Sequence, residues 1–256
     1  MLVGISGLRQ HLGHHFHEPC LIRGHGHHRV RLGDVSPNGR LRLDALARFV
    51  QDVSNDDTTD AGLDDDMAWV VRRTVVEVHA EAVLREELAM STFCGGIGSR
   101  WAERRVSARG DGGAHIETAT LWVHLDMDTG RPLKLPAQFH ELYAEAAAGR
   151  TIRARLRHDD PPPQSPGGPA PAPWPLRFTD FDVLGHVNNA ACWQIVEEAL
   201  SKHRDLRAPL RAEVQHRTAI ERDAAVMVAT GSIDDGLGVW VSADDAVAVT
   251  ATVLRR

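Results

Sequence analysis

The sequence lacks the features that mark several common classes of protein. Its 256 residues include three cysteines, Cys20, Cys94 and Cys192, and none of them forms a CxxC pair. Such a sparse, odd set indicates reduced thiols rather than a disulfide framework, so we expect a cytoplasmic protein. No run approaches the roughly 20 apolar residues that a membrane span needs. The N-terminus also lacks the apolar core and cleavage site of an export signal.

Charge and motifs exclude further classes. The formal net charge is -6, which gives no overall attraction to nucleic acid. The chain has no G-x-S-x-G elbow, phosphate-binding loop or H-E-x-x-H motif. Serine hydrolases, nucleotide enzymes and zinc proteases therefore have no support. Hydrophobic residues make up 43% of the chain, an ordinary value for a globular protein.

Two segments show no helix or strand periodicity. Residues 1–28 hold seven histidines without the spacing of a defined metal site. We interpret this segment as a disordered tail, with metal binding as the less favoured alternative. Residues 159–175 are dominated by Pro, Gly and Ala, which cannot sustain a helix or a strand ladder. They predict a linker between two ordered segments, residues 29–158 and 176–256.

The two ordered segments show the same order of elements. The first has a short strand at residues 28–35, a helix at 41–62, and strands at 67–80, 88–97, 99–110 and 114–127. The second has a short strand at 175–181, a helix at 188–203, and strands at 210–220, 223–233, 237–243 and 245–255. The periodicities predict an α+β fold in which each half is a curved antiparallel sheet wrapped around one long helix. Two such sheets can pair edge to edge.

The halves also resemble each other in sequence just before their helices. Setting residues 33–46 over residues 179–192 pairs Asp34 with Asp180, Ser36 with Asp182, Gly39 with Gly185, and Arg40 with His186. The Asp/His pair is present only in the second copy. We therefore predict one chemical site per chain, in the second half, with the first half contributing walls.

The loop before the second helix holds the chemical groups that are needed for attack on a carbonyl carbon. Asp182 supplies a base or a nucleophile, and His186 can orient Asp182 or hold a water molecule. Gly185 allows close approach of the backbone. Asn188 and Asn189 lie at the helix N-terminus, where unpaired amides can bind an oxyanion.

Each of these residues also has a structural interpretation. Asp182 can be a turn or cap residue, and His186 can be a structural hydrogen-bonding histidine. Capping is the favoured role of the two asparagines. Cys192 lies on the apolar stripe of the helix, where a buried thiol is favoured over a nucleophile.

The motif DFDVLGHVNN, residues 180–189, resembles the active-site signature of hot-dog-fold thioesterases. Residues 38–62 and 99–136, the latter with a TGRP turn, are similar to the first half of the acyl-acyl carrier protein thioesterases. This resemblance covers roughly residues 29–256. It implies a tandem (double) hot-dog fold with a catalytic second unit. It also implies hydrolysis of a fatty acyl thioester of acyl carrier protein (ACP), without a metal or other cofactor.

The resemblance also assigns residues. The family's catalytic Asp falls on Asp182, its motif His on His186, and its two asparagines on Asn188 and Asn189. A helix Glu of many relatives falls on Glu198, which can equally be a solvated helix residue. The sequence departs from the plant enzymes at Leu184, which replaces an Asn, and at Ala219 and Ile220, which replace a Glu and a Cys. Glu221, one residue away, is interpreted as structural.

The acyl chain requires an apolar slot, for which the expected wall is Leu46, Val50, Val53, Leu121 and Val123. Acidic ACP is expected to bind basic residues, either Arg100, Arg104, Arg105, Arg131 and Lys134 or Arg153, Arg155 and Arg157. An acyl-CoA thioesterase and a non-catalytic acyl-binding or regulatory hot-dog protein are the alternatives. The chain can act as a monomer or a homodimer.

Overall fold

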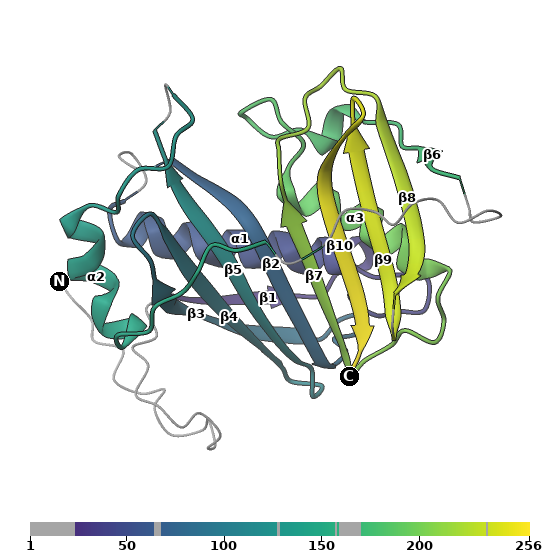
Figure 1. Cartoon of the computed structure of the whole chain (residues 1–256). Helices are drawn as coiled ribbons and strands as arrows, with labels where there is room; N and C mark the ends of the chain where they lie inside the picture. Colours follow the sequence, from purple (N-terminus) through teal and green to yellow (C-terminus); the bar gives the residue numbers. More distant parts are fainter. Residues whose placement is uncertain (1–23, 64–67, 127–128, 157, 159–169, 234) are drawn as a thin grey trace.

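The computed structural model describes residues 24–63, 68–126, 129–156, 158, 170–233 and 235–256. Within them, ten strands form one continuous antiparallel sheet in the order β1-β3-β4-β5-β2-β7-β10-β9-β8-β6 (Figure 1). The two long helices lie behind this sheet in the view of Figure 1, and each is covered by the strands of its own half. The α+β architecture predicted from the sequence is confirmed.

The first unit contains β1 (Gly24–Arg29), α1 (Leu43–Asp60), β2 (Ala68–Ala80), β3 (Glu87–Ile97), β4 (Trp101–Gly110), β5 (His115–Leu125) and α2 (Ala137–Ala147). The helix α1 ends where Gly62 adopts a φ of +66°, a conformation that favours glycine. Strand β1 begins at Gly24, inside the segment interpreted as a tail. Residues 1–23 lie outside the described residues. The sequence interpretation also missed α2, which covers the end of the first sheet beside β3.

The second unit contains β6 (Ala172–Pro173), α3 (Asn189–Ser201), β7 (Leu210–His216), β8 (Val226–Ile233), β9 (Gly236–Ala243) and β10 (Ala246–Arg255). Most of the predicted linker, residues 159–169, lies outside the described residues. Its end forms β6, which pairs with β8. A 3-10 turn precedes each long helix, at Leu32–Asp34 and Phe178–Asp180, in the regions where the sequence predicted short strands.

The two units join through antiparallel pairing of β2 with β7, from Arg73 opposite Gln215 to Val78 opposite Leu210. This contact confirms the expected edge-to-edge pairing. The apolar faces of α1 and α3 share one core, to which Leu46, Val53 and Trp193 each contribute side chains that are at most 1% exposed. No helix in the described part of the chain is long and apolar enough to cross a membrane.

A buried ion pair connects α3 to the loop before α1. The carboxylate of Glu197 contacts the Arg40 guanidinium and accepts a hydrogen bond from the Leu43 backbone N–H at 3.1 Å. Both side chains are only about a tenth exposed. Removing one partner of such a pair leaves the other charge buried and uncompensated.

We expect Glu197→Ala to lower the free energy of unfolding by about 3–5 kcal/mol, because Arg40 keeps its charge and loses its carboxylate. Urea denaturation measures this loss. Glu198→Ala is the matched control, since the adjacent Glu198 is exposed and its removal should change stability by less than about 0.5 kcal/mol. Equal losses for the two variants would contradict this assignment.

Candidate functional site

The backbone of residues 178–189, here called the second loop, repeats that of residues 32–43, the first loop. In the second loop Asp182 N donates to His186 O at 3.0 Å, and Gly185 N donates to Asp182 O at 3.0 Å. In the first, Ser36 N donates to Arg40 O at 2.9 Å, and Gly39 N donates to Ser36 O at 2.8 Å. Gly185 and Gly39 both have positive φ, +81° and +86°. The structure thus confirms the sequence alignment, and it makes the two loops residue-by-residue counterparts.

Asp182 lies at the turn of the second loop and is half-buried. Its Oδ1 accepts a hydrogen bond from Leu184 N at 2.9 Å, which fixes the carboxylate in an Asx turn. The neighbouring side chains of Val183 and Leu184 are exposed. The second carboxylate oxygen of Asp182 makes no hydrogen bond to any residue that the structure describes.

His186 pairs with Glu221 and not with Asp182. Its Nε2 lies 3.2 Å from Glu221 Oε1. The Glu221 segment is held against the second loop by a backbone hydrogen bond from Val187 N to Ile220 O at 3.0 Å. This carboxylate, whose side chain is 69% exposed, lies where it can orient the imidazole. The sequence interpretation classed Glu221 as structural. The signal that could have found it was its position next to Ala219 and Ile220, which replace the Glu and Cys of the plant enzymes.

The N-terminus of α3 is partly capped. Asn188 is the N-cap residue, and its Oδ1 accepts from Ala190 N at 2.8 Å. The amides of Gly185, Val187 and Asn188 are all bonded to backbone carbonyls. Among residues that the structure describes, the backbone amides of His186 and Asn189 have no hydrogen-bond partner. Of the five amides from Gly185 to Asn189, these two remain able to bind a ligand oxygen.

The first loop shows what such an amide can hold. Leu43, the first residue of α1, is the counterpart of Asn189, the first residue of α3. Its N–H is occupied by the carboxylate of Glu197. An anionic oxygen is therefore already bound at this position in one of the two copies, as expected at a helix N-terminus.

Each long helix contacts the loop of the other unit. Glu197 of α3 reaches the first loop, and Gln51 of α1 reaches the second, where its Nε2 lies 3.4 Å from Asn188 Oδ1. Each loop is therefore completed by a side chain from the other unit. The sequence interpretation did not single out Gln51.

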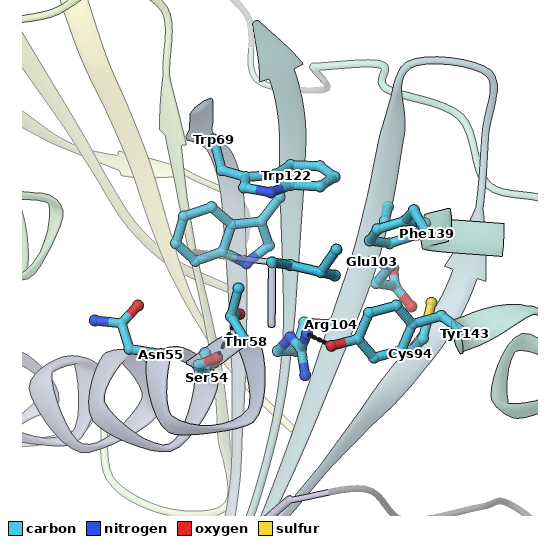
Figure 2. Close-up of a pocket in the computed structure, with 12 residues that line it drawn as sticks. Ser54, Asn55, Thr58, Trp69, Cys94, Glu103, Arg104, Trp122, Phe139 and Tyr143 are labelled. Carbon is cyan, nitrogen blue, oxygen red and sulfur yellow. Dashed lines mark hydrogen bonds between the residues drawn. The ribbon is translucent and has the colours of Figure 1, made fainter. Parts of the chain in front are cut away.

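A cavity of about 250 Å³ begins one helical turn beyond Gln51. Figure 2 shows Ser54, Asn55 and Thr58 of α1 on one side, with Trp69 and Trp122 opposite Phe139 and Tyr143. The aromatic rings, together with Leu63, Cys94 and Ala102, give the cavity apolar surface, next to the polar side chains of Glu103 and Arg104. At one wall Tyr143 donates a hydrogen bond to Asp57 Oδ2 at 2.8 Å, and Arg104 contacts both of these residues.

The predicted wall residues do not line this cavity. Leu46, Val50 and Val53 are buried in the shared core instead. Strand β5 alternates faces, and Trp122 lines the cavity, so Leu121 and Val123 point to the opposite face. That face is also covered, because the segment after α2 crosses the sheet (Figure 1) and Arg155 O accepts a hydrogen bond from Arg73.

The structure also does not bring Glu198 to the second loop. Glu198 is exposed and lines a polar cleft of about 1110 Å³ beside the first loop. Of the expected basic residues, Arg104 has a side chain only 12% exposed and directed at Asp57 and Tyr143, so it is not part of a docking surface. Arg157 lies outside the described residues. No cluster of potential metal ligands occurs in the described ranges.

The interpretation of Cys192 as a buried thiol is confirmed. Burial raises its pKa to about 12, with repulsion from Asp180 adding to the effect. Burial likewise raises the pKa of Cys94, at the cavity wall, to about 11. Thiolates are the reactive form of cysteine, so neither residue is suited to act as a nucleophile.

In a Cys20→Ser variant, we expect neither remaining thiol to react with Ellman's reagent at pH 8 until urea unfolds the chain, because burial keeps both protonated. The absorbance of the released thiolate measures the reaction. Rapid reaction of one thiol in the folded protein would contradict the burial of these residues.

Comparisons with known proteins match both halves of the chain to the same family. The sequence matches the family described as Acyl-ACP thioesterase N-terminal domain over residues 25–143 and Acyl-ACP thioesterase C-terminal domain over residues 170–246. Uncharacterized proteins of Mycobacterium tuberculosis, from strains H37Rv and CDC 1551, are 30% identical over 230 residues, covering 89% of this chain and 90% of theirs.

Solved structures share the fold. An acyl-ACP thioesterase from Bacteroides thetaiotaomicron superposes with a TM-score of 0.72 at 16% identity, covering 90% of this chain and 96% of that one. A 12:0-ACP thioesterase from Umbellularia californica gives a TM-score of 0.70 at 17% identity, covering 90% and 95%.

Proposed function

The chain belongs to the acyl-ACP thioesterase family and is a thioester hydrolase, and we propose that its second loop is the active site, with Asp182 as the general base. The observation that carries this proposal is the backbone amide of Asn189, which has no hydrogen-bond partner in the described ranges of the chain. Its counterpart in the first loop holds a carboxylate oxygen. The developing oxyanion of a thioester would take the same position, with the unpaired His186 amide as the second donor.

The proposed reaction needs a base and charge stabilisation but no stronger nucleophile. Asp182 removes a proton from water, and the water oxygen attacks the carbonyl carbon. The oxyanion then collapses, the C–S bond breaks, and the carrier leaves as a thiolate whose conjugate acid has a pKa of about 8.5. The thiolate therefore needs little protonation to depart. A base that touches the reacting water contributes roughly 10²–10⁴-fold to the rate.

His186 and Glu221 act together in this proposal. The carboxylate of Glu221 lies 3.2 Å from Nε2 and orients the ring in this proposal. Glu221 takes the role of the acid that the plant enzymes carry at the position of Ala219. Asp182 Oδ1 is engaged by Leu184 N, which leaves one oxygen for water and favours base over nucleophile chemistry.

The acyl chain is proposed to follow the exposed face of α1. Gln51 contacts the second loop, Asn55 lies one turn further, and Thr58 lies about 10 Å beyond Gln51 at the helical rise. Asn55 and Thr58 both line the cavity. The rings of Trp69, Trp122 and Phe139 then supply apolar surface for the chain.

ACP is proposed to dock beside the ends of β4 and β5. Arg100, Arg131 and Lys134 are exposed there. The backbone carbonyls of Arg100 and Lys134 both accept hydrogen bonds from His124, whose ring packs against Trp69 of the cavity. Positive charge close to the acyl pocket would attract an acidic carrier. We further propose that one chain suffices for activity and that it works in the cytoplasm.

We expect Asp182→Asn to reduce kcat on acyl-ACP by about 10²–10⁴-fold, because the amide cannot take a proton from water. Stability should hardly change, since the Asn oxygen can still accept from Leu184 N. Release of free fatty acid, followed by mass spectrometry, measures the effect. Asp223→Asn is the matched control at an exposed neighbouring carboxylate.

A variant that retains wild-type turnover without Asp182 would overturn the assignment of the base. Single turnover in ¹⁸O-water tests the mechanism separately. General-base attack places ¹⁸O only in the product, whereas attack by Asp182 itself would label the protein.

We expect Ala102→Phe to shift the chain-length preference toward shorter acyl groups, because the added ring fills cavity volume next to Trp122. Turnover on the shortest substrates should stay within a few fold of wild type. A panel of acyl-ACPs of increasing length measures the profile. Ala246→Phe, on an exposed position of β10, should leave it unchanged; a profile that also stays unchanged in Ala102→Phe would remove the acyl chain from this cavity.

A further inference from the structure

The two loops differ in the residue that each receives from the opposite helix. Both helices begin at aligned positions, Leu43 and Asn189, so counting along them makes Gln51 the counterpart of Glu197. Glu197 places a carboxylate on the helix N-terminal amide of the first loop. Gln51 places a neutral amide next to the second loop and donates to Asn188 Oδ1 instead.

We propose that Gln51 is a positioning residue whose neutrality keeps the Asn189 amide open for the substrate oxygen. The inference rests on the proposed function of the second loop and adds a contribution from the first unit to it. In this view the first loop is a closed copy of the site. Its amide is occupied by Glu197, and Arg40 stands where the second loop has His186.

Three contacts distinguish the closed copy from the open one. The Glu197 carboxylate bonds Leu43 N at 3.1 Å and also contacts Arg40, whose NH1 donates to Leu41 O at 3.3 Å. In the open copy, the neutral Gln51 has no carboxylate oxygen to accept from the Asn189 amide. Its hydrogen bond of 3.4 Å supports the cap residue Asn188, whose oxygen also accepts from Ala190 N. A single change of Gln51 to Glu therefore recreates the group that closes the first loop.

The conservative change Gln51→Glu is expected to reduce activity more than truncation by Gln51→Ala. Gln51→Glu should lower kcat on acyl-ACP by on the order of 100-fold. The new carboxylate would accept the hydrogen bond of the Asn189 amide, which could then no longer stabilise the oxyanion. Gln51→Ala lacks that carboxylate and should lose less than about 10-fold. Thr59→Glu, on an exposed position of the same helix, controls for added charge and should retain wild-type kcat. If Gln51→Glu is as active as Gln51→Ala, or more active, the proposal is overturned.

A second measurement does not depend on hydrolysis. The double variant Gln51→Glu with His186→Arg rebuilds the Arg40–Glu197 pair in the second loop. The Tm of the double variant should be higher than the sum of the two single-variant shifts predicts, because the new Glu and Arg attract each other only when both are present. Additive shifts would overturn the proposal. A wild type without thioesterase activity would instead refute the proposed function, and the Tm cycle would still decide whether Gln51 occupies the position of Glu197.

Discussion

The contact of each long helix with the loop of the other unit is the constraint on which the rest of the structure depends. Glu197 of α3 binds the first loop, and Gln51 of α1 contacts the second. The shared core and the pairing of β2 with β7 hold the helices in this relation. Neither unit alone would present a complete loop, which gives a physical reason for joining two similar units in one chain.

The two copies use the same backbone for different purposes. In the first, a buried ion pair fills the helix N-terminus and ties the units together. In the second, Ser36 and Arg40 are replaced by Asp182 and His186, and two amides have no hydrogen-bond partner among the described residues. Unpaired donors and a half-buried acid without a charged partner contribute little to folding stability. The division therefore allows one loop to stabilise the fold while the other remains available for chemistry.

Much of the fold could be predicted from the sequence, because its elements follow strong periodicities. The strands and both long helices lie close to where alternation and helical spacing place them. Strand β1 was missed because GHGHHR has no alternating apolar pattern, and α2 was missed because its apolar residues span little more than two turns. The repeat was visible because Gly39 and Gly185 mark the same positive-φ turn.

The site was harder to predict, because it depends on contacts between distant segments. Alternation along β5 separates Leu121 from Trp122 but does not say which face meets α1 when both faces are buried. Glu198 and Glu197 are neighbours in sequence, yet of the two only Glu197 bonds to the first loop, whereas Glu198 is exposed in the cleft beside it. The approach of Gln51 to Asn188 and of Glu221 to His186 arises from packing of the two units, which no local pattern encodes.

The most direct test of the central claim is a crystal structure with a non-hydrolysable acyl-pantetheine amide bound. The account predicts that the amide carbonyl oxygen accepts hydrogen bonds from the backbone N–H groups of His186 and Asn189, with the acyl chain between Trp69 and Phe139. An analogue bound instead in the polar cleft beside Arg40, with the second loop empty, would contradict it.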